Sequence, residues 1–207
     1  MPDRVCKYIK RGEVVPHYKR VPGEKVYLSP ISMDDIDIFM SWINDPEIVY
    51  NLAFYTKVTS LSQEKELVEA LAKNGNTFSI VTQENDRIIG NCGFFGINEI
   101  NRSAEIGIMI GEKDYHSKGY GTEAVRLLLK FGFENRNYNN IRLHVFSLNG
   151  RAIACYEKAG FKRQGICREA LIRGDKKYDM LYMDILADEY FGRIISTEDI
   201  SYENPFQ

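Results

Sequence analysis

The stretch between a predicted strand and a predicted helix reads His116-Ser117-Lys118-Gly119-Tyr120-Gly121. Its two glycines let the backbone curl closely, so that several N–H groups can converge on one point. The helix that follows adds the positive end of its dipole, and Lys118 adds a positive charge. The loop therefore suits a phosphate or pyrophosphate, although Gly-x-Gly before a helix is also typical of a purely structural turn. The spacing matches neither a Walker A loop nor the Gly-x-Gly-x-x-Gly dinucleotide fingerprint.

The segments on either side of this loop predict a mixed α+β domain. Strand and helix patterns alternate irregularly along the chain. Strands are predicted over 26–28, 77–81, 88–95, 104–110, 141–146, 164–172 and 178–186, and helices over 32–43, 62–73, 122–134 and 150–158. Because this order is not a strict βαβ repeat, it indicates a mixed, mainly antiparallel sheet rather than a doubly wound one. Gly107 and Gly111 indicate a bulge or a close approach to the strand backbone.

Composition and charge limit the function further. The 207 residues are 44% hydrophobic and 27% charged, as expected for one soluble globular domain. A net charge of −2 argues against a general nucleic-acid binder, and no stretch approaches 18 apolar residues, which argues against a transmembrane helix. The four cysteines form no C-x-x-C pair and have no histidine at zinc-ligand spacing, so we expect no metal site. Reduced thiols without a signal peptide indicate the cytoplasm.

The two ends of the chain differ in charge. Residues 1–25 carry seven basic and three acidic side chains, whereas residues 188–207 carry one basic and five acidic side chains. We therefore divide the chain into an N-terminal extension (1–24), a single domain (25–187) and an acidic C-terminal tail (188–207). Solvated tails explain this pattern, and so do segments that pack on each other or across a dimer interface.

A second motif lies downstream, at the start of the helix predicted over 150–158. It consists of Asn149, Ala152, Tyr156, Gly160 and Phe161. Together the two motifs resemble the GCN5-related N-acetyltransferase (GNAT) family. That family's pyrophosphate loop runs Gln/Arg-x-x-Gly-x-Gly/Ala, and its later helix often reads Asn-x-x-Ala-x-x-x-Tyr-x-x-x-Gly-Phe.

The resemblance extends over residues 26–186, because the order of elements matches as well. His116 departs from the family's Gln or Arg. The segments 104–107 and 42–46 look most like the branch of ribosomal-protein N-terminal acetyltransferases, which also includes small-amine acetyltransferases.

The resemblance implies a fold and a cosubstrate. The fold is a GNAT-like three-layer α+β structure, with a mixed, mainly antiparallel sheet flanked by helices and splayed at an acetyl-CoA slot. The amides of the loop would hold the pyrophosphate: His116, Ser117, Lys118, Gly119, Tyr120 and Gly121. The backbone of Ile108, Met109 and Ile110 would pair with the pantetheine, and Asn149 would hydrogen-bond it. A bulge at Gly107 would separate this strand from the strand over 141–146.

The resemblance also implies an N-acetyltransferase that moves an acetyl group to a primary amine by direct attack. Glu105 is the candidate general base, acting through water, or else a strand carboxylate paired with Arg102 or another cation. Tyr156 is the candidate proton donor to the CoA sulfur, since a phenol with a pKa near 10 is protonated at neutral pH, or else a core tyrosine. Cys155 lacks an assigned base, and His144 is expected in the core or on the surface.

The acceptor amine is the least constrained part of the prediction. The expected lining is aromatic, with carboxylates nearby to suit a cationic amine. The aromatic candidates are Trp42, Phe54, Tyr55, Tyr178, Phe95 and Tyr182, and the acidic ones are Glu105, Asp114 and Asp179. Branch resemblance favours a protein N-terminus; a polyamine, an aminoglycoside or an amino sugar is the alternative. A non-catalytic acyl-CoA sensor is a hypothesis of another class, and a homodimer is compatible with all of them.

Overall fold

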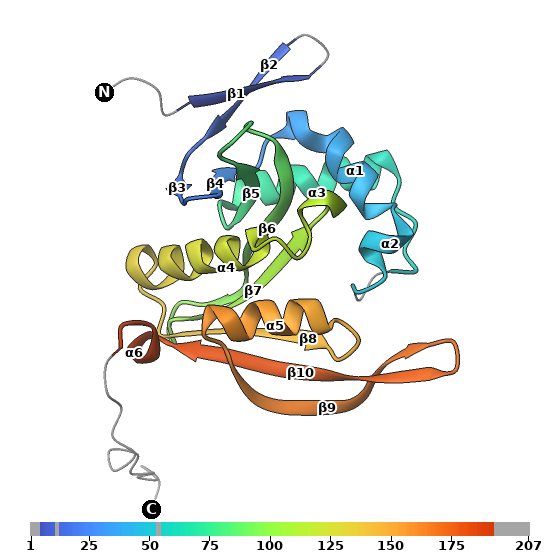
Figure 1. The fold of residues 1–207 in the computed structure, drawn as a ribbon, viewed down its shortest axis with the longest axis vertical. Coiled ribbons are helices and arrows are strands. Elements are labelled where there is room, and N and C mark those ends of the chain that lie inside the picture. The colour runs from blue at the N-terminus through green and yellow to red at the C-terminus, as the bar shows by residue number, and fades with distance from the viewer. Residues whose placement is uncertain (1–4, 11–12, 53–54, 193–207) are drawn as a thin grey trace, which may run out of the picture.

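The computed structural model describes residues 5–10, 13–52 and 55–192 (Figure 1). Within these residues an eight-stranded sheet has the order β3-β4-β5-β6-β7-β8-β10-β9, and β1 and β2 form a separate hairpin. All neighbouring pairs are antiparallel except β7 and β8. The strands are β1 (Val5–Lys10), β2 (Glu13–Tyr18), β3 (Val21–Pro22), β4 (Val26–Pro30), β5 (Thr77–Thr82), β6 (Ile88–Asn98), β7 (Ser103–Ile110), β8 (Asn140–Phe146), β9 (Lys162–Arg173) and β10 (Lys176–Leu186). The predicted mixed, mainly antiparallel sheet is confirmed.

Local sequence signals explain where the helices begin and end. The helices are α1 (Ile36–Ile43), α2 (Pro46–Val49), α3 (Leu61–Asn74), α4 (Tyr120–Lys130), α5 (Gly150–Ala159) and α6 (Ala187–Tyr190). Helix α3 starts at a capping box formed by Ser60 and Gln63 and ends at Gly75, whose φ of 66° favours glycine. Helix α5 starts at Asn149, which caps the amide of Ala152. No helix in the described ranges has the length and apolarity needed to cross a membrane.

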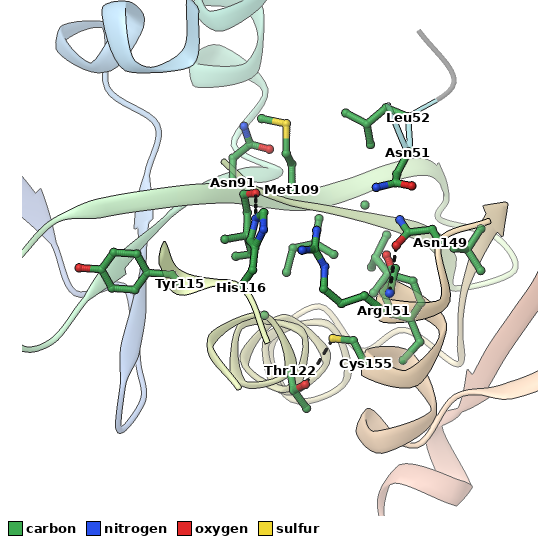
Figure 2. Close-up of a pocket in the computed structure, with 18 of the residues that line it drawn as sticks. Asn51, Leu52, Asn91, Met109, Tyr115, His116, Thr122, Asn149, Arg151 and Cys155 are labelled. Carbon is green, nitrogen blue, oxygen red and sulfur yellow. Dashed lines mark hydrogen bonds between the residues drawn. The ribbon is translucent and has the colours of Figure 1, made fainter. Parts of the chain in front are cut away.

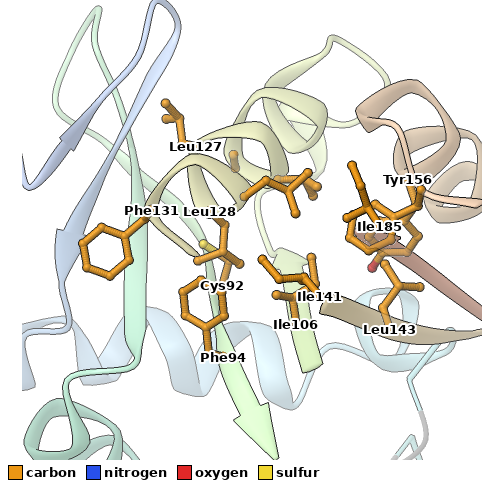
Figure 3. Close-up of a cluster of buried hydrophobic side chains, with 14 of the residues drawn as sticks. Cys92, Phe94, Ile106, Leu127, Leu128, Phe131, Ile141, Leu143, Tyr156 and Ile185 are labelled. Carbon is orange, nitrogen blue, oxygen red and sulfur yellow. The ribbon is translucent and has the colours of Figure 1, made fainter. Parts of the chain in front are cut away.

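Two hydrophobic clusters make the layers of the fold. The larger cluster packs α4 and α5 against the sheet, with Leu128, Ile141 and Phe94 near its centre (Figure 3). The smaller cluster joins α1, α2 and α3 through Phe39, Trp42, Ile48 and Val68, together with Ile88 of β6. Helices of both clusters thus pack on the sheet. A cavity between these two groups of helices opens at β7 and β8.

The parallel pair β7–β8 is short. It runs only from Ser103 opposite Asn140 to Glu105 opposite Arg142, whereas both strands continue beyond it. The predicted separation of these strands is confirmed, but its predicted cause is wrong. Gly107 stays in register with Gly93, and the irregularity of the β6–β7 pair lies between Phe95 and Asn98.

The two strand glycines instead make room for aromatic rings. A Cβ atom on Gly107 would lie 3.0 Å from Cε2 of Phe95, and a Cβ atom on Gly111 would lie 2.0 Å from Cδ2 of Trp42. Such a contact with the Trp42 ring is sterically excluded, so glycine is required at position 111. The close approach that the sequence indicated is therefore the packing of Trp42 on this backbone.

The boundary predicted between residues 24 and 25 stays a prediction, and residues just before it pack on the domain. His17 is fully buried, with its Nε2 atom 3.1 Å from Oδ2 of Asp35, and Val21 is buried in the larger cluster. The last part of the predicted extension is therefore in contact with the domain core. At the other end the ring of Tyr190 stacks on Phe133, while residues 193–207 lie outside the described residues.

Candidate active site

A cavity of about 1410 Å³ opens where β7 and β8 separate. Its walls come from β7 and β8, from α4 and α5 on one side, and from α1 and α3 on the other. Figure 2 shows His116 beside β7, with Asn149 and Arg151 on α5 across the cavity. The two predicted motifs, 116–121 and 149–156, therefore meet at one site.

The loop before α4 has the backbone form of an anion-binding nest. Ser117 has a φ of 59° and Gly119 a φ of 90°, so left-handed residues alternate in the turn that begins the helix. The non-glycine residue in this conformation marks strain of the kind found at functional sites. Of the predicted residues, His116, Ser117, Gly119 and Gly121 line the cavity, whereas Lys118 and Tyr120 are not part of its wall.

His116, which departs from the family pattern, fixes the loop to the sheet. Its Nε2 atom lies 2.8 Å from the backbone oxygen of Ile110. A carbonyl oxygen only accepts, so Nε2 carries the hydrogen in this contact. The histidine therefore ties the loop to the last residue of β7.

Lys25 is a residue of this site that the sequence reasoning missed. Its Nζ atom donates a 3.0 Å hydrogen bond to the oxygen of Lys118 and lies 5.6 Å from the centre of the Tyr120 ring. The turn that carries Lys25 is held in place by Glu123 of α4, whose Oε1 atom accepts from the amides of Glu24 and Lys25 at 2.6 and 2.8 Å. The ammonium group is thereby placed at the N-terminal end of α4, beside the nest.

The edge of β7 that faces the cavity can be assigned from its hydrogen bonds. The amide of Gly111 donates to Ile89 of β6 at 2.9 Å, and backbone groups alternate between the two sides of a strand. The backbone groups of Ile108 and Ile110 therefore face the open side, and those of Met109 face β6. Of the three predicted strand residues, Ile108 and Ile110 present their backbone to the cavity. Met109 is also part of the cavity wall, although its backbone groups face β6.

Helix α5 brings Asn149 and Tyr156 to the cavity wall. The Oδ1 atom of Asn149 accepts from the Ala152 amide at 3.1 Å, so this side chain caps the helix and keeps its Nδ2 group as a further donor. Tyr156 is 6% exposed and packs edge-to-face on Phe161. Burial, and secondarily the neighbouring Cys155, raises the pKa of Tyr156 above its usual range. The phenol is therefore protonated at neutral pH, as a proton donor must be.

Glu105 lies on the cavity wall at the point where the β7–β8 pair ends. Its carboxylate is flanked by Arg142, at 3.5 Å, and by Nδ1 of His144, at 3.7 Å. Arg102 instead donates to Asn137, so it is not the partner of Glu105. His144 also lines the cavity, and its side chain is 52% exposed, in keeping with the surface position that was one of the two expected for it.

The predicted acceptor residues do not gather at the cavity. Trp42 is 3% exposed in the smaller core cluster, and its Nε1 atom donates to Glu112 at 3.0 Å. The ring of Tyr55 lies under the guanidinium of Arg173, and Tyr178 pairs with Leu171 in the β9–β10 hairpin. None of these three is part of the cavity wall as described, and Phe54 lies outside the described residues.

The same holds for most of the secondary acceptor candidates. Phe95 does line the cavity. Tyr182 and Asp114 do not contribute to the described wall, and Asp179 accepts from the amide of Glu169 at 2.9 Å.

The acceptor side of the cavity is formed mainly by aliphatic residues of α1 and α3. Helix α3 contributes Glu64, Leu67, Val68 and Leu71 to the wall. These positions follow the i, i+3, i+4, i+7 spacing of one helix face. A carboxylate within that apolar stripe was the signal available in the sequence, and the expectation of aromatic residues passed over it.

Cysteine and metal chemistry find no support at this site. The Cys155 thiol accepts a hydrogen bond from Thr122 at 3.4 Å, and burial raises the pKa of this thiol, which disfavours the nucleophilic thiolate. Among the residues that the structure describes, no group of three or more His, Cys, Asp or Glu side chains could hold a metal ion.

Residues 25–162 match the family model described as an acetyltransferase (GNAT) domain. The uncharacterised N-acetyltransferase p20 of Bacillus licheniformis is 30% identical over 174 residues, covering 82% of this chain and 97% of that protein. The putative ribosomal N-acetyltransferase YdaF of Bacillus subtilis is 30% identical over 105 residues, covering 51% of this chain and 57% of that protein.

A solved structure supports the same fold. The spermidine N-acetyltransferase of Vibrio cholerae, in complex with CoA and spermine, superposes with a TM-score of 0.71 at 24% identity. The match covers 82% of this chain and 99% of that one. The separated β7 and β8 strands and the helices around them thus form the GNAT fold.

Proposed function

The chain belongs to the GNAT family of acetyltransferases and is an acetyl-CoA-dependent N-acetyltransferase, and we propose that it acetylates a small-molecule primary amine by direct attack. The observation that carries this proposal is the cavity at the end of the β7–β8 pair, where the nest, the open strand edge, Glu105 and Tyr156 share one wall. Membership of this family argues against the two alternatives of a non-catalytic sensor and of a purely structural glycine turn.

The residues present fit acetyl-CoA. An alanine Cβ at Gly121 would lie 3.6 Å from Ile110 and 3.9 Å from Cys155, which are ordinary contacts, so protein packing does not require glycine there. The absent side chain leaves the nest open for a ligand. The amides of the nest and the Lys25 ammonium would hold the pyrophosphate. The backbone groups of Ile108 and the amide of Ile110, whose oxygen already accepts from His116, would hold the pantetheine.

The chemistry requires a neutral amine, a stabilised carbonyl oxygen and a proton for the departing sulfur. Acetyl-CoA supplies its acetyl group as a thioester: the amine nitrogen bonds to the carbonyl carbon, and the carbon–sulfur bond breaks. Glu105 takes the proton that the amine loses, through water, and Tyr156 gives a proton to the sulfur. The phenolate that remains is disfavoured by burial, so Tyr156 recovers a proton from solvent. An amide on the open edge of β7 stabilises the negative carbonyl oxygen.

The acceptor proposal rests on the shape of the cavity wall. A protein N-terminus requires an open groove. The similarity to the putative ribosomal N-acetyltransferase YdaF, which covers 51% of this chain, supports that acceptor. The wall formed by α1 and α3 instead presents a mainly apolar surface, from buried Phe39 and Val68 to half-exposed Leu67, which favours a small amine with an apolar body. On this ground we propose a small amine rather than the protein N-terminus that the branch resemblance favoured.

Two further proposals concern the cellular location and the oligomeric state. The described cysteines, Cys92, Cys155 and Cys167, are free thiols, which supports a cytoplasmic location. A homodimer stays a prediction, with the exposed edge strand β9 as its route.

The first experiment is a thermal shift with acetyl-CoA, CoA and ATP, each alone, followed by an assay of CoA release. A ligand specific for the native state at a hundredfold excess over its Kd stabilises by about 2.7 kcal/mol. We expect both CoA species to raise the Tm and ATP to leave it unchanged. CoA release should then require a primary amine and be lost in Glu105→Gln. The same rise with ATP, or release that is insensitive to Glu105→Gln, would contradict the proposed roles.

A further inference from the structure

Glu64 is a buried carboxylate with an unused acceptor atom. The residue is 5% exposed and lines the cavity from α3. Its Oε2 atom is buried and has no hydrogen-bond partner among the described residues. Buried polar atoms are nearly always paired in native proteins, and a charged one without a partner is costly. A hydrogen-bond donor on a ligand in the cavity would therefore stabilise this carboxylate.

The helix geometry aims Glu64 at the cavity. Glu64 is in the first turn of α3 and shares its face with Val68, one turn later, and with the wall residues Leu67 and Leu71. Burial raises the pKa of Glu64, and Lys57 opposes this effect from a distance without forming an ion pair in the described structure. The carboxylate therefore lies on an otherwise apolar face of α3 and would be stabilised by a cation placed in the cavity.

The charges on the cavity wall divide it into two ends. Among the described wall residues of α1, α2, α3 and the segment after α2, Glu64 is the single charged one. The end formed by α4 and α5 carries Arg126, Arg151 and Lys158, and its Glu123 is held by backbone amides. An anionic ligand is thus matched to one end and a cationic ligand to the other.

From this arrangement we propose that Glu64 binds a cationic group of the acceptor, so that the preferred substrate is a small amine with a second positive charge separated from the reacting nitrogen by an apolar spacer. The reacting nitrogen must be neutral when it attacks, so the charge that pairs with Glu64 belongs to another group of the same molecule. The aliphatic wall residues of α3, Leu67, Val68 and Leu71, would accommodate the spacer. This inference rests on the proposed function and names the acceptor class of the same site.

The test compares linear diaminoalkanes with linear alkylamines of equal length, by CoA release, for the wild type, Glu64→Gln and Glu66→Gln. Glu66 is exposed on the same helix and is the matched control. Hydrogen bonds to charged groups contribute about 1.5–3 kcal/mol, so kcat/KM of Glu64→Gln for the best diamine should fall about 10- to 100-fold. The values for alkylamines should change little, and Glu66→Gln should behave as the wild type. The KM for acetyl-CoA should stay constant in all three proteins.

The outcomes separate this inference from the proposed function. If Glu64→Gln keeps the preference for diamines, or if the wild type prefers alkylamines, the role of Glu64 is overturned while the acetyltransferase stands. Acetylation of peptide N-termini but of neither amine series would also overturn it. CoA binding without release for any amine would instead contradict the proposed function. A Tm measurement on Glu64→Gln excludes misfolding, because an isosteric neutral side chain should fold at least as well.

Discussion

Replacing Glu64 with glutamine should stabilise the folded protein, and the gain should depend on pH. Because burial raises the pKa of Glu64 above its ordinary value of 4.5, the folded state binds this proton more tightly than the unfolded chain. Stability therefore falls as the pH rises through the range between the unfolded and the folded pKa. Glutamine removes this loss, so the difference between variant and wild type is near zero at acidic pH and grows towards neutral and alkaline pH.

The size of the gain follows from the surroundings of the carboxylate. Leaving a buried polar group without a partner costs about 1–3 kcal/mol, and more when it is charged. Lys57 offsets part of this cost, and a buried amide keeps polar atoms of its own. We therefore expect a value near the lower end, about 1 kcal/mol, which corresponds to about 2–4 °C in Tm for a chain of this size.

The assay is urea unfolding of the wild type, Glu64→Gln and Glu66→Gln across about pH 4 to pH 8, without ligand. Glu66→Gln should follow the wild type at every pH. A gain in Glu64→Gln that does not vary with pH, or a loss of stability, would refute the reasoning. It would show that an interaction within the folded chain already stabilises the carboxylate in the ligand-free protein.

Two other substitutions test separate parts of the site, and a third tests the core packing at the end of β7. Tyr156→Phe should lower kcat by about 10²- to 10⁴-fold, measured by CoA release, with an unchanged Kd for acetyl-CoA; a normal kcat would exclude the donor role. Lys25→Met should raise the Kd for acetyl-CoA about 10-fold in calorimetric titrations, because a charged hydrogen bond is lost. The Kd for acetyl-pantetheine, which has no pyrophosphate, should not change, and an equal loss for both ligands would contradict pyrophosphate binding. Gly111→Ala would place a methyl group 2.0 Å from the Trp42 ring and should destabilise by about 1–3 kcal/mol in urea unfolding; unchanged stability would show that the ring can move.

Local signals in the sequence were sufficient for the turn before α4 and for the cap of α5. Gly119 and Asn149 act within a few residues of their own position: one takes a φ of 90° and the other caps a helix. Such roles depend on backbone geometry that short motifs encode. The order of strands and helices likewise determined the sheet, because each element carried its own periodicity.

The acceptor side, and the place of Lys25 beside the nest, depended on contacts between distant segments. Trp42 was placed in the acceptor site as an aromatic residue near a family segment, but the missing side chain at Gly111, 69 residues later, lets it pack into a core. Lys25 reaches the oxygen of Lys118 across 93 residues, which no local pattern encodes. Glu64 was visible as a carboxylate in an apolar helical stripe, but its burial follows from the packing of α3 against α1 and the sheet.

The short β7–β8 pair has a mechanical consequence. Three residue pairs, from Ser103 with Asn140 to Glu105 with Arg142, form the backbone seam between the part of the sheet that ends at β7 and the part that begins at β8. A ligand arm that pairs with the backbone of Ile108 and with the Ile110 amide would lengthen this seam without any change in the chain. A bound ligand would then restrict motion between the two parts of the sheet. Slower deuterium uptake at the amides of Ile108 and Ile110 would report this restriction.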